Sequence, residues 1–175
     1  MKLLILGIVA AGKTTLAREL SAITGVPWYE GDRIAYEDGT DLRRTREEEV
    51  KLLEKIDACG EWIVEEVYRS SHSVLLEWAE RIVFLDPPLG VRKRRIFTRF
   101  LRQQCGLEKC RYKSDLHMLR AMYRWTASFE KDRPRFEAML QGLGDKVTVV
   151  HTGAQVLALK ESLKNAACQM PRGGI

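Results

Sequence analysis

The sequence predicts an α/β domain in which helices cover both faces of a parallel β-sheet. The prediction rests on short apolar runs that alternate with helix-forming segments, and on a glycine-containing loop directly after the first run. This alternation favours parallel strands, because a crossover between parallel neighbours is long enough to hold a helix. The runs with the length and composition of buried strands are 1–6, 26–30, 62–64, 81–85 and 146–151.

Three helix-forming segments lie in the first half of the chain. Residues 13–24 carry apolar side chains at helical spacing and are followed by Gly25. Residues 46–58 show the same spacing with acidic side chains outward, and Gly60 follows them. A short helix is expected at 73–78.

The second half contains three more predicted helices. The first, at 89–104, is strongly basic, and the last is expected at 154–166. Between them lies a long helical region at 115–141, which we expect to be bent or broken near 132–134 because proline disrupts a helix interior.

The organisation along the chain indicates one domain at 1–167, since the sequence shows no internal repeat and no interdomain linker. Two irregular polar intervals are natural mobile flaps. We expect 32–46 to cover an acceptor molecule and 100–115 to contribute to a lid. A tail at 168–175, rich in proline and glycine, is expected to be disordered.

The loop after the first strand fits the phosphate-binding pattern G-x-x-x-x-G-K-[ST] without a mismatch. In such a loop Lys13 reaches the β- and γ-phosphates, and the hydroxyl of Thr14 binds Mg²⁺. The helix that begins here adds its positive N-terminal end. The sequence therefore predicts binding of ATP with Mg²⁺. The residues expected to contact the phosphates are Gly7, Ala10, Ala11, Gly12, Lys13, Thr14 and Thr15.

Composition excludes several classes of protein. The hydrophobic fraction of 45% and charged fraction of 30% are typical of a soluble domain. No apolar stretch approaches the roughly 20 residues of a membrane span, so no membrane partner is expected. Removing residues 1–11 as a signal peptide would destroy the phosphate loop, and the four cysteines are irregularly spaced. We therefore expect a cytoplasmic protein.

The net charge of +5 favours anionic ligands, either small phosphates or nucleic acid. Its distribution is uneven: residues 47–66 are acidic, whereas 92–111 form a basic block. That block is the main argument for a nucleic-acid partner.

Several motifs together resemble those of the adenylate kinase-like nucleoside monophosphate kinases. Within them, the chain is most similar to the bacterial DNA topology modulation proteins, over nearly its whole length to about residue 164. The resemblance implies a three-layer P-loop kinase fold: five parallel strands in the order 2-3-1-4-5, with a helical lid. The motifs are the loop at 7–15, the strand-end acid in 62–65, the segment 83–88, the pair Arg95 and Arg99, and the segment 132–135.

The resemblance implies roles for four further residues. Glu65 would hold Mg²⁺ through water, although such kinases usually carry Asp-Gly where this chain has Glu65-Glu66, and an ordinary exposed strand-end pair is the alternative. Arg69 would bind the phosphate of the acceptor, or simply lie on the surface. Arg95 and Arg99 would stabilise the transferring charge from the base of the lid. The alternative for this pair is a solvated basic face, or one that lies on nucleic acid.

The flap after the second strand carries candidates for acceptor binding. Asp32 stands at the edge where α/β sheets bind ligands, and could orient an acceptor or take a hydroxyl proton. It fits a turn or a helix cap equally well. Arg46, with its neighbours Arg43 and Arg44, could clamp an anion, although most exposed arginines only solvate a surface.

Other polar residues carry less information. Cys105, Cys110 and His117 supply three of the four ligands that structural zinc requires, so zinc in the lid is not favoured. His72 and His151 have no plausible partners in the sequence.

These observations favour an ATP-dependent kinase that transfers the γ-phosphate to a small acceptor, a nucleotide or nucleoside. Two alternatives stay open. The protein could be an ATP-dependent nucleic-acid-binding regulator, ranked second because the motifs of a helix-turn-helix or zinc finger are missing. It could also phosphorylate a non-nucleotide acceptor, such as a sugar or a shikimate-like acid.

Overall fold

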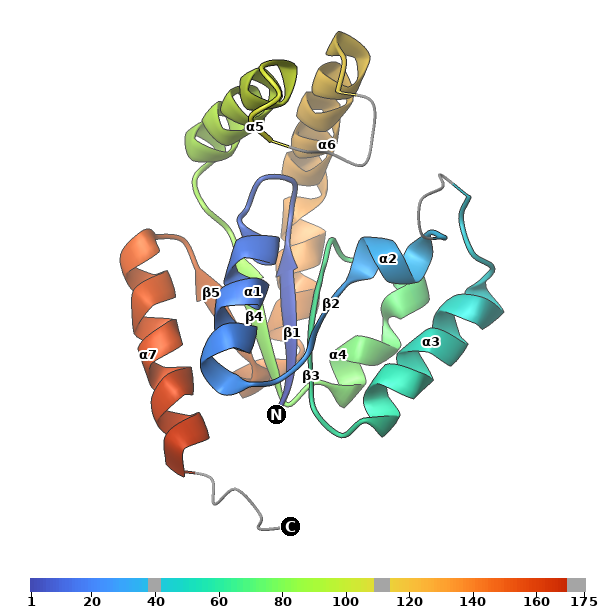
Figure 1. Ribbon diagram of the computed structural model, residues 1–175, viewed down its shortest axis with the longest axis vertical. Coiled ribbons are helices and arrows are strands. Elements are labelled where there is room, and N and C mark those ends of the chain that lie inside the picture. The colour runs from blue at the N-terminus through green and yellow to red at the C-terminus, as the bar shows by residue number, and fades with distance from the viewer. Residues whose placement is uncertain (38–41, 109–113, 170–175) are drawn as a thin grey trace.

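A computed structural model describes residues 1–37, 42–108 and 114–169 of the chain. The five strands form one parallel sheet in the order β2-β3-β1-β4-β5, which confirms the predicted fold class and strand order (Figure 1). The strands are β1 (Lys2–Gly7), β2 (Trp28–Glu30), β3 (Trp62–Glu66), β4 (Arg81–Leu85) and β5 (Val147–Val150).

Helices follow the strands as the alternation predicts. One difference is α2, a short helix that occupies the start of the interval expected to be irregular, 32–46. Single turns of 3₁₀ helix cover Ser70–His72 and Gly144–Lys146. The helices are α1 (Lys13–Thr24), α2 (Gly31–Ala35), α3 (Arg46–Ala58), α4 (Val74–Trp78), α5 (Leu89–Gln104), α6 (Leu116–Gln141) and α7 (Gly153–Gln169). None of them, in the described part of the chain, is long and apolar enough to cross a membrane.

Two cores lie on opposite faces of the sheet because the side chains of β1 alternate in direction. Leu3 and Ile5 pack under α1 and α7. Leu4 and Leu6 pack on the other face, under α3, α4 and the C-terminal part of α6. Figure 1 shows this arrangement, with α1 and α7 on one side of the strands and α3 and α4 on the other.

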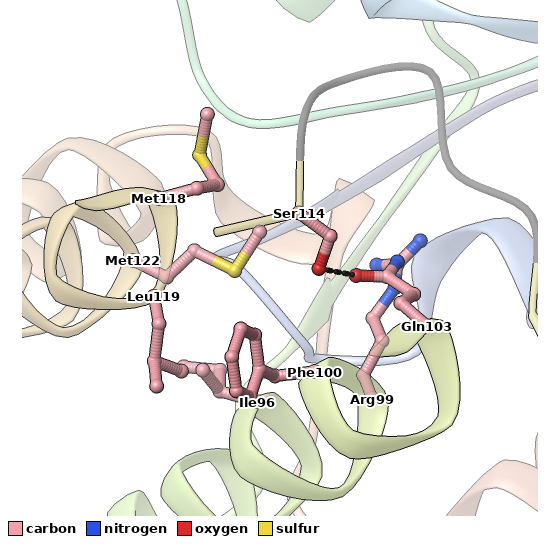
Figure 2. A pocket seen from close by; sticks show the side chains of 8 residues that line it. All are labelled: Ile96, Arg99, Phe100, Gln103, Ser114, Met118, Leu119 and Met122. Carbon is pink, nitrogen blue, oxygen red and sulfur yellow. Dashed lines mark hydrogen bonds between the residues drawn. The ribbon is translucent and has the colours of Figure 1, made fainter. Parts of the chain in front are cut away.

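Helix α5 and the N-terminal half of α6 form a helical hairpin above the carboxyl edge of the sheet (Figure 1). Ile96 and Phe100 of α5 face Met118, Leu119 and Met122 of α6 across a small apolar gap (Figure 2). The region expected to contribute to a lid, 100–115, includes the end of α5 and leads to α6, and its residues 109–113 lie outside the described residues. The hydroxyl of Ser114 donates to the side-chain oxygen of Gln103 over 2.8 Å, closing the end of the gap.

The base of the hairpin is fixed by a cluster of ion pairs at the end of β4. Arg133 of α6 donates to both carboxylate oxygens of Asp86, over 2.8 and 3.0 Å. Arg92 of α5 is fully buried; it donates to the carbonyl of Pro87 over 3.0 Å and pairs with Glu130. These contacts hold both helices of the hairpin against the sheet.

Of the bend or break expected at 132–134, the break is absent, because α6 is one helix with Pro134 in its interior. Proline removes one hydrogen bond from a helix, so neighbouring contacts must compensate. Arg133 is held by Asp86 as described, and Phe136 packs edge-on against Phe84 with ring centroids 5.0 Å apart. Tertiary contacts on both sides of the proline therefore preserve the helix.

We expect Glu130→Gln to lower the free energy of unfolding at neutral pH by about 1 kcal/mol, less than is usual for hydrogen bonds to charged groups, because Glu130 is partly exposed. The hydrogen bond from Arg133, with that from Arg92, lowers the pKa of the Glu130 carboxyl from its ordinary 4.5 to about 2. An acid with a lowered pKa in the folded state stabilises the protein above the unfolded pKa and loses this effect as the pH falls through the folded value.

Urea titrations of the parent and the Glu130→Gln variant check this expectation. The difference in unfolding free energy should shrink as the pH falls through the interval between 4.5 and about 2. A difference that stays constant across this interval would contradict the assigned role of Glu130.

Candidate active site

The loop between β1 and α1 folds back on itself at the carboxyl end of β1. The N–H of Ala11 donates to the carbonyl of Ile8 over 3.1 Å, and Lys13 Nζ donates to the same carbonyl over 3.3 Å. Gly12, with a φ of 105° that favours glycine, leads directly into α1, so the positive end of that helix faces the loop. The predicted phosphate-binding residues all lie at the end of β1, in this loop or in the first turn of α1: Gly7, Ala10, Ala11, Gly12, Lys13, Thr14 and Thr15.

Lys13 and Glu65 form the electrostatic centre of the site. Burial lowers the pKa of the Lys13 ammonium group, and the nearby charge of Glu65 opposes this effect. Burial raises the pKa of the Glu65 carboxyl, and Lys13 and the hydroxyl of Thr14 oppose the rise. Each charge therefore stabilises the other in a poorly hydrated place.

Thr14 and Glu65 fit the chemistry of a magnesium site. The hydroxyl of Thr14 donates to Glu65 Oε1 over 2.7 Å, so a neutral and an anionic oxygen lie side by side beside the loop. Magnesium prefers such oxygen ligands and commonly takes one or two from the protein. The two predicted metal-binding residues are thus brought together from α1 and β3.

The basic helix α5 sends one of its two candidate arginines to the loop. Arg95 Nη1 donates to the main-chain carbonyls of Ala11 over 2.9 Å and of Ala10 over 3.3 Å. Arg99, one turn later, forms an ion pair with Glu108 over 3.0 Å instead. Figure 2 shows Arg99 at the side of the α5–α6 gap. The structure therefore brings Arg95 to the loop and leaves Arg99 away from it.

Of the predicted acceptor residues, Asp32 and Arg69 come together in the structure, whereas Arg46 stays apart. Asp32, the second residue of α2, forms an ion pair with Arg69, which follows β3. Arg69 Nη1 also lies 3.7 Å from the carboxylate of Glu66. Arg46, by contrast, is exposed at the first position of α3, and no ion pair within the described residues includes it. Asp32 and Arg69 form a unit beside the loop that does not include Arg46.

Sequence reasoning missed the partners of His72. This ring is buried between the carboxylates of Glu66, at its Nδ1, and Glu49, 3.3 Å from its Nε2. Burial raises the pKa of the Glu66 carboxyl, which His72 and Arg69 oppose. One signal was present: Glu49 stands at the same helical spacing as the apolar Leu53 and Ile56, so an acid on the buried face of α3 needed a partner.

Two further expectations concern His151 and the possible zinc ligands of the lid. His151 does have a partner, since its Nδ1 lies 2.9 Å from the carbonyl oxygen of Asp86. Cys105 is an exposed free thiol at the end of α5, while Cys110 and the end of the predicted tail lie outside the described residues. Within the described ranges, no three His, Cys, Asp or Glu side chains gather as a metal site.

No protein-family model matches the sequence, and no curated protein is significantly similar to it. Similar folds are found among solved structures. A shikimate kinase from Bacteroides thetaiotaomicron has a TM-score of 0.56 and 16% identity, covering 94% of this chain and 96% of its own. A shikimate kinase from Acinetobacter baumannii in complex with shikimate has a TM-score of 0.55 and 15% identity, covering 97% and 94%.

A gluconokinase from Sinorhizobium meliloti is also similar, with a TM-score of 0.51, 16% identity, and coverage of 96% of this chain and 91% of its own. At these identities the similarity establishes the fold. The chain thus shares its architecture, over nearly its full length, with kinases of small molecules.

Lys13→Ala is expected to abolish measurable binding of MgATP while the fold is retained, because Lys13 contacts the loop rather than either core. Isothermal titration calorimetry measures the affinity, and circular dichroism checks the fold. Lys51→Ala, on the exposed side of α3, is the matched control and should bind MgATP as the parent does. Parent-like affinity in Lys13→Ala would rule out phosphate binding by this loop.

Proposed function

We propose that this protein is a phosphotransferase that moves the γ-phosphate of MgATP to a small acceptor, a nucleotide or nucleoside. The observation that supports this most is the convergence of four elements at one edge of the sheet. The loop after β1, Glu65 of β3, Arg95 of α5 and the Asp32–Arg69 pair all lie there. The choice of acceptor rests on the motifs shared with adenylate kinase-like enzymes and DNA topology modulation proteins.

The residues divide into three roles. Lys13 and Arg95 stabilise negative charge on the transferring phosphoryl group, as cations do in related chemistry. Thr14 and Glu65 hold Mg²⁺, which neutralises phosphate charge when it is bound. Arg99 joins Lys13 and Arg95 after its ion pair with Glu108 opens.

The Asp32–Arg69 pair receives the acceptor. For a hydroxyl acceptor, the oxygen bonds to the γ-phosphorus as the bond from that phosphorus to the β–γ bridging oxygen breaks, and ADP leaves. The hydroxyl proton passes to the Asp32 carboxylate, whose side chain is 70% exposed and faces Arg69. The acceptor-binding role expected for Arg46 stays a prediction, because Arg46 is exposed at the first position of α3, apart from this pair.

Two alternatives compete with this function. The names of the similar structures favour a sugar or a shikimate-like acid as acceptor. They support such an acceptor only indirectly, because acceptor pockets are built from loops that vary on one fold. A nucleic-acid-binding regulator would use the basic face of α5. The contact of Arg95 with the phosphate loop supports the kinase over the regulator, because it turns this cation toward bound ATP.

The direct test is transfer from γ-³²P-labelled ATP to a panel of nucleosides, nucleotides, sugars and shikimate. The proposed function predicts a labelled nucleoside or nucleotide product with Mg²⁺ present, and none after chelation of the metal. Labelling of a sugar or shikimate alone would favour the alternative acceptor. Hydrolysis without transfer, together with DNA binding, would favour the regulator.

Arg95→Ala is expected to lower kcat by roughly 10²-fold, the scale of one lost charge-stabilising contact in a transition state, with a smaller effect on ATP affinity. Arg99→Ala serves as the comparison on the same helix and should have the weaker effect. Steady-state kinetics with varied ATP separates the two parameters. A larger loss in Arg99→Ala would mean that Arg99, and not Arg95, is the main charge-stabilising arginine.

A further inference from the structure

Arg69, the cation of the acceptor site, is held between two carboxylates. One of its terminal nitrogens pairs with Asp32, and the other lies 3.7 Å from Glu66 Oε2. Its side chain is only 20% exposed. An incoming anion would have to displace Asp32 and would then lie close to Glu66.

Glu66 is fixed in this position by its surroundings. Its side chain is buried, and His72 Nδ1 pairs with the same oxygen that faces Arg69. A Cβ atom at Gly31 would lie 2.7 Å from Glu66 Oε2, so the start of α2 can pack here only as glycine. The Glu66 carboxylate that helps to neutralise Arg69 is therefore held by the packing between α2 and β3. The neutralisation of Arg69 does not depend on the exposed side chain of Asp32 alone.

The row of ionisable side chains continues away from the site. His72 Nε2 lies 3.3 Å from Glu49 Oε2, and Arg43 Nε lies 3.5 Å from Glu49 Oε1. The His72 ring thus lies between two carboxylates, hydrogen-bonded to Glu66 through Nδ1 but not to Glu49 through Nε2. This arrangement anchors Glu66 from behind and links the acceptor site to α3.

Among the described residues, none of the other arginines near α2, including exposed Arg33, takes part in the ion pairs with Asp32 and Glu66. Arg44 Nη1 donates to the main-chain carbonyls of Arg33, over 2.7 Å, and of Tyr36. Arg43 is paired with Glu49. Arg46 is exposed at the start of α3, apart from the Asp32–Arg69 unit.

The charges at the site now favour a particular acceptor. On the acceptor side, two carboxylates, of Asp32 and Glu66, face the single cation of Arg69. ATP adds further negative charge, which Mg²⁺, Lys13, Arg95 and the loop offset on their own side of the site. A phosphate or carboxylate bound at Arg69 would thus meet more negative than positive charge.

We propose that the acceptor is an uncharged hydroxyl compound, such as a nucleoside, and that the Glu66–His72 pair determines this specificity by keeping Arg69 neutralised. This proposal rests on the proposed phosphotransferase function and narrows its acceptor. Asp32 and Arg69 then bind hydroxyl groups by hydrogen bonds, for which an ion pair offers both an acceptor and donors.

The test uses matched pairs of acceptors that differ in one anionic group. Each common ribonucleoside is compared with its 5′-monophosphate, and glucose with gluconate, in the transfer assay with labelled MgATP. For the parent protein, kcat/KM should be at least about 10-fold higher for the uncharged member of each accepted pair, the scale of one unfavourable charge contact. A preference for the charged member overturns the proposal, and this arm needs no variant.

Glu66→Gln tests the specificity-determining role. The amide can still accept from His72 but carries no charge, so the ratio of uncharged to charged kcat/KM should fall by about 5-fold or more. Glu130→Gln is the matched control, since the same substitution in the cluster below the hairpin should leave the ratio unchanged. An unchanged ratio in Glu66→Gln, or an equal change in the control, overturns the role of Glu66.

The outcomes separate this proposal from the proposed function. Transfer to glucose but not gluconate, with no nucleoside accepted, supports the uncharged acceptor and contradicts the nucleotide or nucleoside choice. Transfer to nucleoside monophosphates alone contradicts the uncharged acceptor and leaves the kinase function standing. Transfer to no member of any pair contradicts both the proposed phosphotransferase function and the uncharged acceptor.

Discussion

Parallel pairing of β1 with β3 sets Ile5 opposite Glu65 and Leu6 opposite Glu66, so both strands end at one edge of the sheet. The loop that follows β1 and the acids that end β3 therefore meet. The Thr14–Glu65 hydrogen bond follows from this register. A shift of one residue would turn Glu65 to the opposite face, because side chains alternate along a strand. The Thr14–Glu65 pair depends on this register, whereas the Asp32–Arg69 pair depends on the pairing of β2 with β3, which sets Glu30 opposite Glu65.

A second set of contacts determines where the basic helix lies. Arg92 and Arg133 are tied to Glu130 and Asp86 at the end of β4, which fixes α5 and α6 to the sheet. Arg92 is buried on one side of α5. Arg95 stands three residues further along this helix and is thereby directed to the loop between β1 and α1. Ion pairs of this kind contribute modestly to stability because desolvation offsets their attraction. Their role here is to orient the hairpin.

The α/β class and its alternating elements could be predicted from the sequence because strand composition, helical spacing and the phosphate-loop motif all act locally, whereas the strand order came from the family resemblance. Contacts between distant segments could not. Arg95 and Arg99 look equivalent in a helical pattern, and only Glu108 and the carbonyl of Ala11 distinguish them. The continuous helix through Pro134 likewise depends on tertiary packing that overrides a local rule. His72 gave no local signal, although an acid on the buried face of α3 indicated an unseen partner.

The site's own charge explains why nucleotide and metal should bind together. Glu65 stands beside the loop that is expected to receive phosphates, and two like charges there would repel each other. Mg²⁺ held by Thr14 and Glu65 would offset this repulsion. Lys13 would act in the same direction: burial disfavours its charged form, and added phosphate charge would favour it. The acid that opposes ATP alone would thus select for MgATP.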